Sequence, residues 1–168
     1  MSVRRRISAW LFPVGAVAAA AFVWYSSLRL PDQVASHFGT SGLPNGFMPR
    51  NIYVFFMLFF VIGLPVLMVY LTWMRMGRPG MRINLPNREH WMAPVRREAT
   101  VAYLRERVMQ FGVLLLAFLC YGHWLVVRAN LSHPVFLDQN WFISGLAVFI
   151  VAMLIWLKRL LGHFRDPG

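Results

Sequence analysis

Four long apolar runs dominate the pattern of hydrophobic and polar positions along the chain. They cover residues 9–28, 51–73, 108–127 and 140–157, and none of them contains an aspartate, glutamate, lysine or arginine. Uncharged apolar runs of about 18 residues or more are typical of helices that cross a bilayer. The pattern therefore predicts an all-α integral membrane protein with four transmembrane helices.

Polar segments separate these runs and set the expected topology. Residues 29–50 and 128–139 form two loops on one side of the membrane, and residues 74–107 form a longer, basic loop on the other. No other composition shift divides the chain, so residues 1–168 are interpreted as a single membrane domain.

The overall composition agrees with a membrane protein. The chain has 168 residues, of which 58% are hydrophobic and 14% charged, whereas soluble domains are about 45–50% apolar and about 25% charged. The first run follows three arginines, as a signal peptide would, but it is long and lacks a small-residue cleavage site. It is interpreted as a retained helix. The single cysteine, Cys120, excludes a disulfide within one chain.

The basic residues are distributed unevenly, and this predicts an orientation. Of the 17 lysines and arginines, 14 fall in the two terminal segments and the 74–107 loop, and only Arg29, Arg50 and Arg128 fall in the other two loops. The positive-inside rule then places both termini in the cytoplasm. Topology thus explains the net charge of +11 without a nucleic-acid partner. The arginines expected to meet lipid headgroups are Arg75, Arg78, Arg82, Arg96 and Arg97.

The first outer loop contains residues that favour the start and the end of a short helix. Pro31 suits a first helical position, Asp32 complements the helix dipole, and Gly39 suits a closing position. We therefore expect a surface helix at 31–38, with an apolar stripe formed by Leu30, Val34 and Phe38. The run Pro44-Asn45-Gly46 then predicts a tight turn.

The long basic loop has two halves. Glycines and prolines interrupt residues 74–93, which predicts irregular structure. From Pro94 the pattern becomes helical, and we expect an amphipathic inner extension that runs directly into the third span. In the second span, Pro65 removes a backbone donor and predicts a kink.

Two short motifs resemble a known family. The arrangement Leu30-Pro31-Asp32, His37-Phe38, Gly42, Pro44 and Gly46 is similar to the signature of an uncharacterised bacterial and archaeal membrane domain, which forms the N-terminal part of SdpI-type proteins. The run Asn84-Leu85-Pro86-Asn87, with Trp91 and Ala93-Pro94, resembles the cytoplasmic loop of short members. The resemblance covers about residues 10–107. It implies a bacterial inner (plasma) membrane protein, in a family linked to toxin immunity and to signalling through a sequestered repressor.

Enzymatic chemistry and transport find little support in the residues. No nucleophile with a paired base, no phosphate-cradling glycine loop and no helical carboxylate pair is evident, so we expect no enzyme and no cofactor. Coupled transport usually needs ionisable residues inside the spans, and only His123 lies there, near one end. A small-solute or ion transporter subunit remains an alternative.

The two outer loops and the adjoining end of the third span hold the remaining candidate residues. His37, His123 and His133 are possible metal ligands, although no two of them share the spacing of a metal motif. We expect His123 to lie at the membrane interface. The residues predicted to bind a partner, such as an extracellular peptide, a toxin or another protein, are Asp32, His37, Phe38 and Phe47. A binding or signalling protein is the favoured interpretation, with outer-face metal binding as a further alternative.

Overall fold

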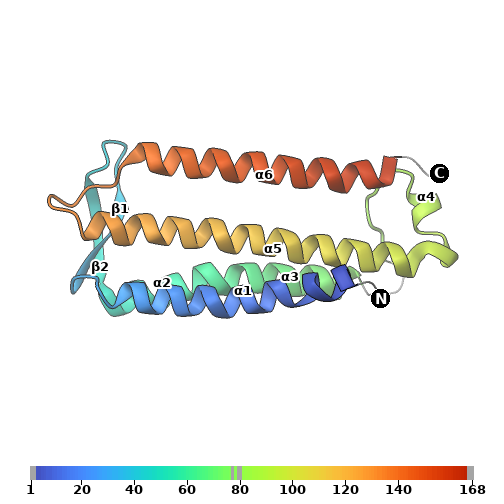
Figure 1. Ribbon diagram of the computed structural model, residues 1–168, viewed down its shortest axis with the longest axis horizontal. Coiled ribbons are helices and arrows are strands. Elements are labelled where there is room, and N and C mark those ends of the chain that lie inside the picture. Colours follow the sequence, from blue (N-terminus) through green and yellow to red (C-terminus); the bar gives the residue numbers. More distant parts are fainter. Residues whose placement is uncertain (1–2, 77, 79–80, 166–168) are drawn as a thin grey trace.

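The computed structural model describes residues 3–76, 78 and 81–165, with side chains from Trp10 onward. Within that part of the chain, four helical segments are long and apolar enough to cross a membrane. They run side by side as an elongated bundle (Figure 1). The prediction of four membrane-spanning helices is therefore confirmed.

The spans agree closely with the apolar runs. The first is α1 (Val3–Ser27), and the second is a continuous segment of α2 (Arg50–Leu58), η1 (Phe59–Gly63) and α3 (Leu64–Met76). The third is α5 (Pro94–Asn130) and the fourth is α6 (Gln139–Arg165). Both chain termini lie at one end of the bundle, which we call the loop end (Figure 1). The opposite end carries two short strands and is called the hairpin end.

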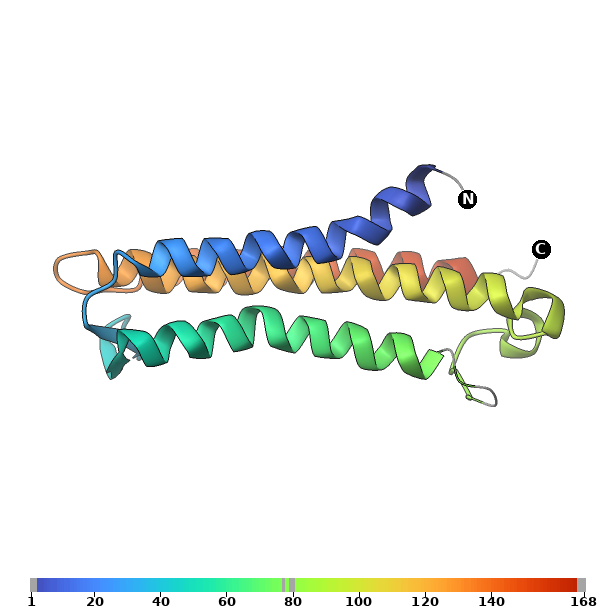
Figure 2. The same ribbon diagram turned by 90° about the horizontal axis from the view of Figure 1, so that it is seen from below.

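Helix α5 occupies the centre of the bundle. It packs against α1 and α3 on one side and against α6 on the other (Figures 1 and 2). Gly112 permits a close approach there, because a Cβ at this position would lie 2.6 Å from the ring of Phe12 and 2.7 Å from Val69. Helix α6 packs mainly on α5, so one face of α6 remains open.

The irregularity predicted at Pro65 takes the form of a π-helical turn, η1, which ends two residues before the proline. Proline has no N–H to give to the carbonyl four residues earlier, and its ring crowds that carbonyl. A widened turn accommodates both effects within a continuous span.

The prediction of a surface helix at 31–38 is wrong. The segment forms strand β1 (Gln33–Phe38), which pairs antiparallel with β2 (Pro44–Pro49). The connecting turn is closed by the N–H of Gly39, which donates to the carbonyl of Leu43 at 2.9 Å. Gly42 has a φ of 81°, a left-handed conformation that favours glycine.

Asn130 fixes the hairpin to the bundle. The amide of Ala35 donates to Asn130 Oδ1 at 2.8 Å, and Asn130 Nδ2 donates to the Ala35 carbonyl at 2.9 Å. The side-chain amide thus offers β1 the donor and acceptor that a neighbouring strand would supply. Beside it, Leu137 N donates to the carbonyl of Gly42 and Gln139 Nε2 donates to that of Gly39, each at 2.9 Å. These hydrogen bonds join the hairpin, the end of α5 and the start of α6 into one unit at the hairpin end.

At the loop end, the predicted helical extension before the third span is present, because α5 begins at Pro94 and continues unbroken into that span. Before it lies α4 (Arg88–Trp91). Asn87 Nδ2 donates to the carbonyl of Arg165 at 2.7 Å, and Trp91 Nε1 donates to that of Phe164 at 3.2 Å. These donors satisfy carbonyls that a helix end leaves unpaired, and they hold the end of α6.

Candidate functional site

A cavity of about 550 Å³ lies at the hairpin end, beneath the hairpin and between the second span, α5 and α6. Its roof is the end of β1 and the following turn, and its walls are mostly aromatic and aliphatic. The lining residues are Ser36, His37, Phe38, Gly39, Thr40, Phe56, Met57, Phe60, Phe118, Leu119, Gly122, His123, Leu125, Val126, Leu137, Gln139 and Phe142.

The chemistry of this cavity is that of a binding site for an apolar group. Its volume is within the range of about 300–1,000 Å³ that is usual for ligand pockets, which are mostly apolar with a few placed polar groups. Polar side chains gather toward the roof, where His37 and Gln139 lie. At Gly122, a Cβ would meet no atom within 4 Å, so the cavity has free space beside α5.

A buried polar network adjoins the cavity at His123. The imidazole is fully buried, and its Nε2 lies 2.8 Å from Ser26 Oγ while its Nδ1 lies 2.9 Å from the Tyr53 hydroxyl. The ring of Phe22 meets it edge-on. His123 is therefore enclosed by α1, α2 and α5 rather than exposed at the surface of the bundle, and its level at the membrane interface stays a prediction.

The partners of Ser26 assign the direction of this network. Ser26 Oγ donates its single proton to the carbonyl of Phe22 at 2.6 Å, so it accepts from His123 Nε2–H. In a neutral imidazole the other nitrogen is then an acceptor, and the Tyr53 hydroxyl donates to it. The network joins three spans and satisfies every polar atom of the ring.

The partner-binding residues predicted from sequence take different positions. Asp32 precedes β1 and forms an ion pair with Arg50 at 3.1 Å. His37 is exposed on β1, and Phe38, which is half-buried, contributes to the cavity. Phe47 lies on β2 with 60% of its surface exposed, and it does not line the cavity. The structure thus brings His37 and Phe38 together at the cavity and leaves Phe47 on a separate edge.

The strand register gives Phe47 a second property. In an antiparallel strand pair, opposite residues alternate between two kinds. In one kind the two residues exchange backbone hydrogen bonds, and in the other the N–H and C=O groups of both residues point away from the partner strand. Ala35 turns both backbone groups to Asn130, and its partner across the sheet is Phe47. The N–H and C=O of Phe47 consequently point to the edge of β2 that faces away from β1.

The possible metal ligands do not gather at one place. Among the described residues, no group of three or more histidine, cysteine, aspartate or glutamate side chains is arranged to hold a metal ion. His37 and His123 line the same cavity, whereas His133 lies exposed in the 131–138 loop. Both ring nitrogens of His123 already have partners.

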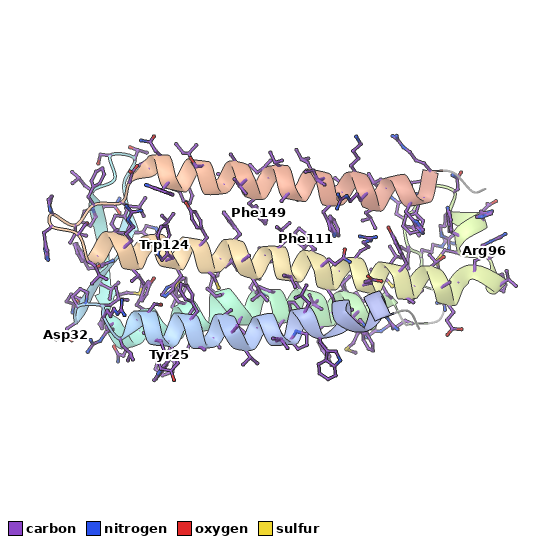
Figure 3. All side chains as sticks on the ribbon, viewed as in Figure 1. Tyr25, Asp32, Arg96, Phe111, Trp124 and Phe149 are labelled. Carbon is purple, nitrogen blue, oxygen red and sulfur yellow. The ribbon has the colours of Figure 1, made fainter. Side chains whose placement is uncertain are left out.

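The predicted headgroup-binding arginines all lie at the loop end. Arg75, Arg78, Arg82 and Arg96 are exposed, and Figure 3 shows Arg96 at the end opposite the hairpin. Arg97 instead donates to the carbonyl of Arg78 at 3.1 Å.

Sequence reasoning missed Arg105, which stacks over the ring of Trp73 at 4.0 Å and donates to its carbonyl. It also missed the hydrogen bonds by which Asn87 and Trp91 cap the C-terminal end of α6. Both contacts join residues far apart in the chain, and no local sequence pattern predicts them.

Comparison with known proteins gives one match. The model of a family described as Domain of unknown function (DUF1648) matches residues 14–63, which span most of α1, the hairpin and the second span through η1. No curated protein and no solved structure matches the chain. The match supports the resemblance to an uncharacterised membrane domain over these residues.

Proposed function

We propose that the protein is a membrane receptor that binds an apolar segment of a partner polypeptide in the cavity beneath the hairpin. The observation that carries this proposal is the cavity itself, with aromatic walls, a polar roof and free space beside Gly122. Binding, rather than catalysis, fits its lining: of the two histidines that line the cavity, His123 has both nitrogens engaged in holding spans together, and His37 lies exposed at the roof.

A polypeptide is favoured over a small solute because the hairpin that roofs the cavity also carries an open strand edge. The outward-facing N–H and C=O of Phe47 offer the pairing that an extended peptide uses when it adds to a sheet edge. Pro44 and Pro49 bound that edge and restrict pairing to a short stretch. We propose that a partner pairs there and places an apolar side chain in the cavity.

The proposed setting is the inner membrane of a bacterium, with the hairpin end outside and both termini in the cytoplasm. The excess of basic residues at the loop end supports this orientation. Arginines at that end would then meet anionic headgroups of the inner leaflet. The similarity to SdpI-type proteins supports a role in immunity to a secreted peptide or in signalling across the membrane.

Photo-crosslinking tests the proposal. Photoreactive p-benzoylphenylalanine would replace Phe142, which lines the cavity, or Phe55, which is 69% exposed on α2 outside it. The expected result, in native membranes, is a polypeptide adduct at position 142 and lipid adducts alone at position 55. Lipid adducts alone at both positions would contradict the proposal and favour a lipid-filled groove.

A further inference from the structure

A second pocket, of about 380 Å³, lies at the hairpin end between the last turns of α5, the 131–138 loop and the start of α6. Two opposite charges line it, Arg128 and Asp138, together with the apolar side chains of Leu125, Phe136 and Trp141. The pocket is distinct from the cavity beneath the hairpin, although Leu125 and Leu137 contribute to both.

Arg128 is held in place without any hydrogen-bond acceptor. Its guanidinium carbon lies 5.4 Å from the ring centre of Trp124 and 5.2 Å from that of Trp141. Within the described part of the chain, the guanidinium makes no hydrogen bond and no ion pair. A planar group with five donors is thus positioned by two indole rings, and a phosphate is the ligand that such a fork matches well.

The position of Arg128 along α5 matches the depth expected for a lipid headgroup. Arg107 and Arg128 are about 32 Å apart along α5, at a rise of 1.5 Å per residue, and a bilayer core is about 30 Å thick. Trp124 lies in the hairpin half of the bundle (Figure 3), one helical turn before Arg128 and therefore nearer the middle of α5. Tryptophans are enriched at membrane interfaces, just inside the headgroup level. With α5 spanning a bilayer core between these two arginines, the guanidinium would lie at the level of the lipid phosphates.

Asp138 adds an exposed negative charge to the same pocket. Its Oδ1 accepts the backbone N–H of Asn140 at 2.9 Å, and it makes no ion pair among the described residues. Arg128 and Asp138 line one pocket yet do not neutralise each other, so the pocket offers separate positive and negative charges. A headgroup with a phosphate and an ammonium complements both.

We infer that this pocket binds the headgroup of an aminophospholipid, with the phosphate on Arg128 and the primary ammonium on Asp138. The apolar walls formed by Leu125, Phe136 and Trp141 then meet the upper part of the lipid. This inference does not depend on the function proposed for the cavity, because it needs neither a polypeptide partner nor a defined orientation.

Native mass spectrometry of the full-length protein, delipidated in detergent, tests the inference. The probes are phosphatidylethanolamine and phosphatidylglycerol with identical acyl chains. The wild-type protein should bind phosphatidylethanolamine at least tenfold more tightly. Arg128→Gln should weaken the binding of both lipids at least tenfold. Asp138→Asn should bring their affinities within threefold of each other, while its side chain can still cap α6.

Arg29→Gln is the matched control, because Arg29 is exposed at the same end and does not line the pocket. It should leave both affinities unchanged. Equal wild-type affinities for the two lipids, or equal losses in Arg29→Gln and Arg128→Gln, would overturn the inference. Full displacement of the lipid by millimolar inorganic phosphate would also overturn it, by assigning the pocket to a free anion. If Arg128→Gln fails to accumulate, the Asp138→Asn comparison decides alone.

Discussion

The clamp between Asn130 and Ala35 gives a prediction whose size follows from its geometry. In Asn130→Ala, the N–H and C=O of Ala35, which is fully buried, lose partners at 2.8 and 2.9 Å. A buried polar group left unpaired costs about 1–3 kcal/mol, so the two together should cost at least about 2 kcal/mol. The cost should appear as easier local opening of the hairpin.

Hydrogen exchange measured by mass spectrometry on peptides that cover β1 is the appropriate assay. Because 1.4 kcal/mol is a factor of ten, a cost of about 2 kcal/mol or more should accelerate exchange in Asn130→Ala at least about 30-fold. Asn51→Ala is the control, since Asn51 is exposed at the same end and its side chain makes no hydrogen bond in the described structure. Exchange within threefold of wild type in Asn130→Ala, or equal acceleration in both variants, would refute this reasoning.

Two further predictions concern stability in detergent. Tyr53→Phe keeps the ring but removes the donor to His123, and it should lower the free energy of unfolding by about 1–3 kcal/mol. Tyr70→Phe, at an exposed tyrosine, is the control and should leave this free energy unchanged. Equal effects of the two substitutions would contradict the network. Gly112→Ala should destabilise by about 1–3 kcal/mol through overpacking against α1 and α3, whereas Gly122→Ala should be neutral or stabilising. Thermal unfolding followed by circular dichroism measures both, and unaltered stability in Gly112→Ala would show that the helices can separate without cost.

The four spans follow from the sequence because their cause is local. A continuous apolar run must form a helix in lipid, where every backbone group needs an internal partner. The start of α5 at Pro94 was predictable for the same reason, since proline at a first helical position is favoured by its own geometry. The helices extend beyond the apolar runs, as with α6, which ends at Arg165, eight residues after the end of its run at 157.

The hairpin was not predictable in this way, because its cause lies elsewhere in the chain. Pro31, Asp32 and Gly39 fit the start and end of a helix, but strand β1 gains its partners from β2 and from Asn130, which is 95 residues away from Ala35. A five-residue connection containing two glycines was the one available sign of a hairpin.

The network at His123 shows the same limit. Its partners come from α1 and α2, at separations of 97 and 70 residues. Sequence alone identified His123 as an ionisable residue near one end of a span. It could not predict that a serine and a tyrosine would meet both nitrogens, because that depends on how three helices pack.

The most direct test of the proposed receptor is to fill the cavity and measure the crosslink at position 142. Gly122→Leu adds a side chain where a Cβ meets open space, and Gly162→Leu makes the same change at a glycine of α6 that also has open space but does not line the cavity. The yield of the polypeptide adduct at position 142 should fall at least tenfold in Gly122→Leu and stay unchanged in Gly162→Leu, at equal protein levels. An undiminished adduct in Gly122→Leu would contradict binding in the cavity.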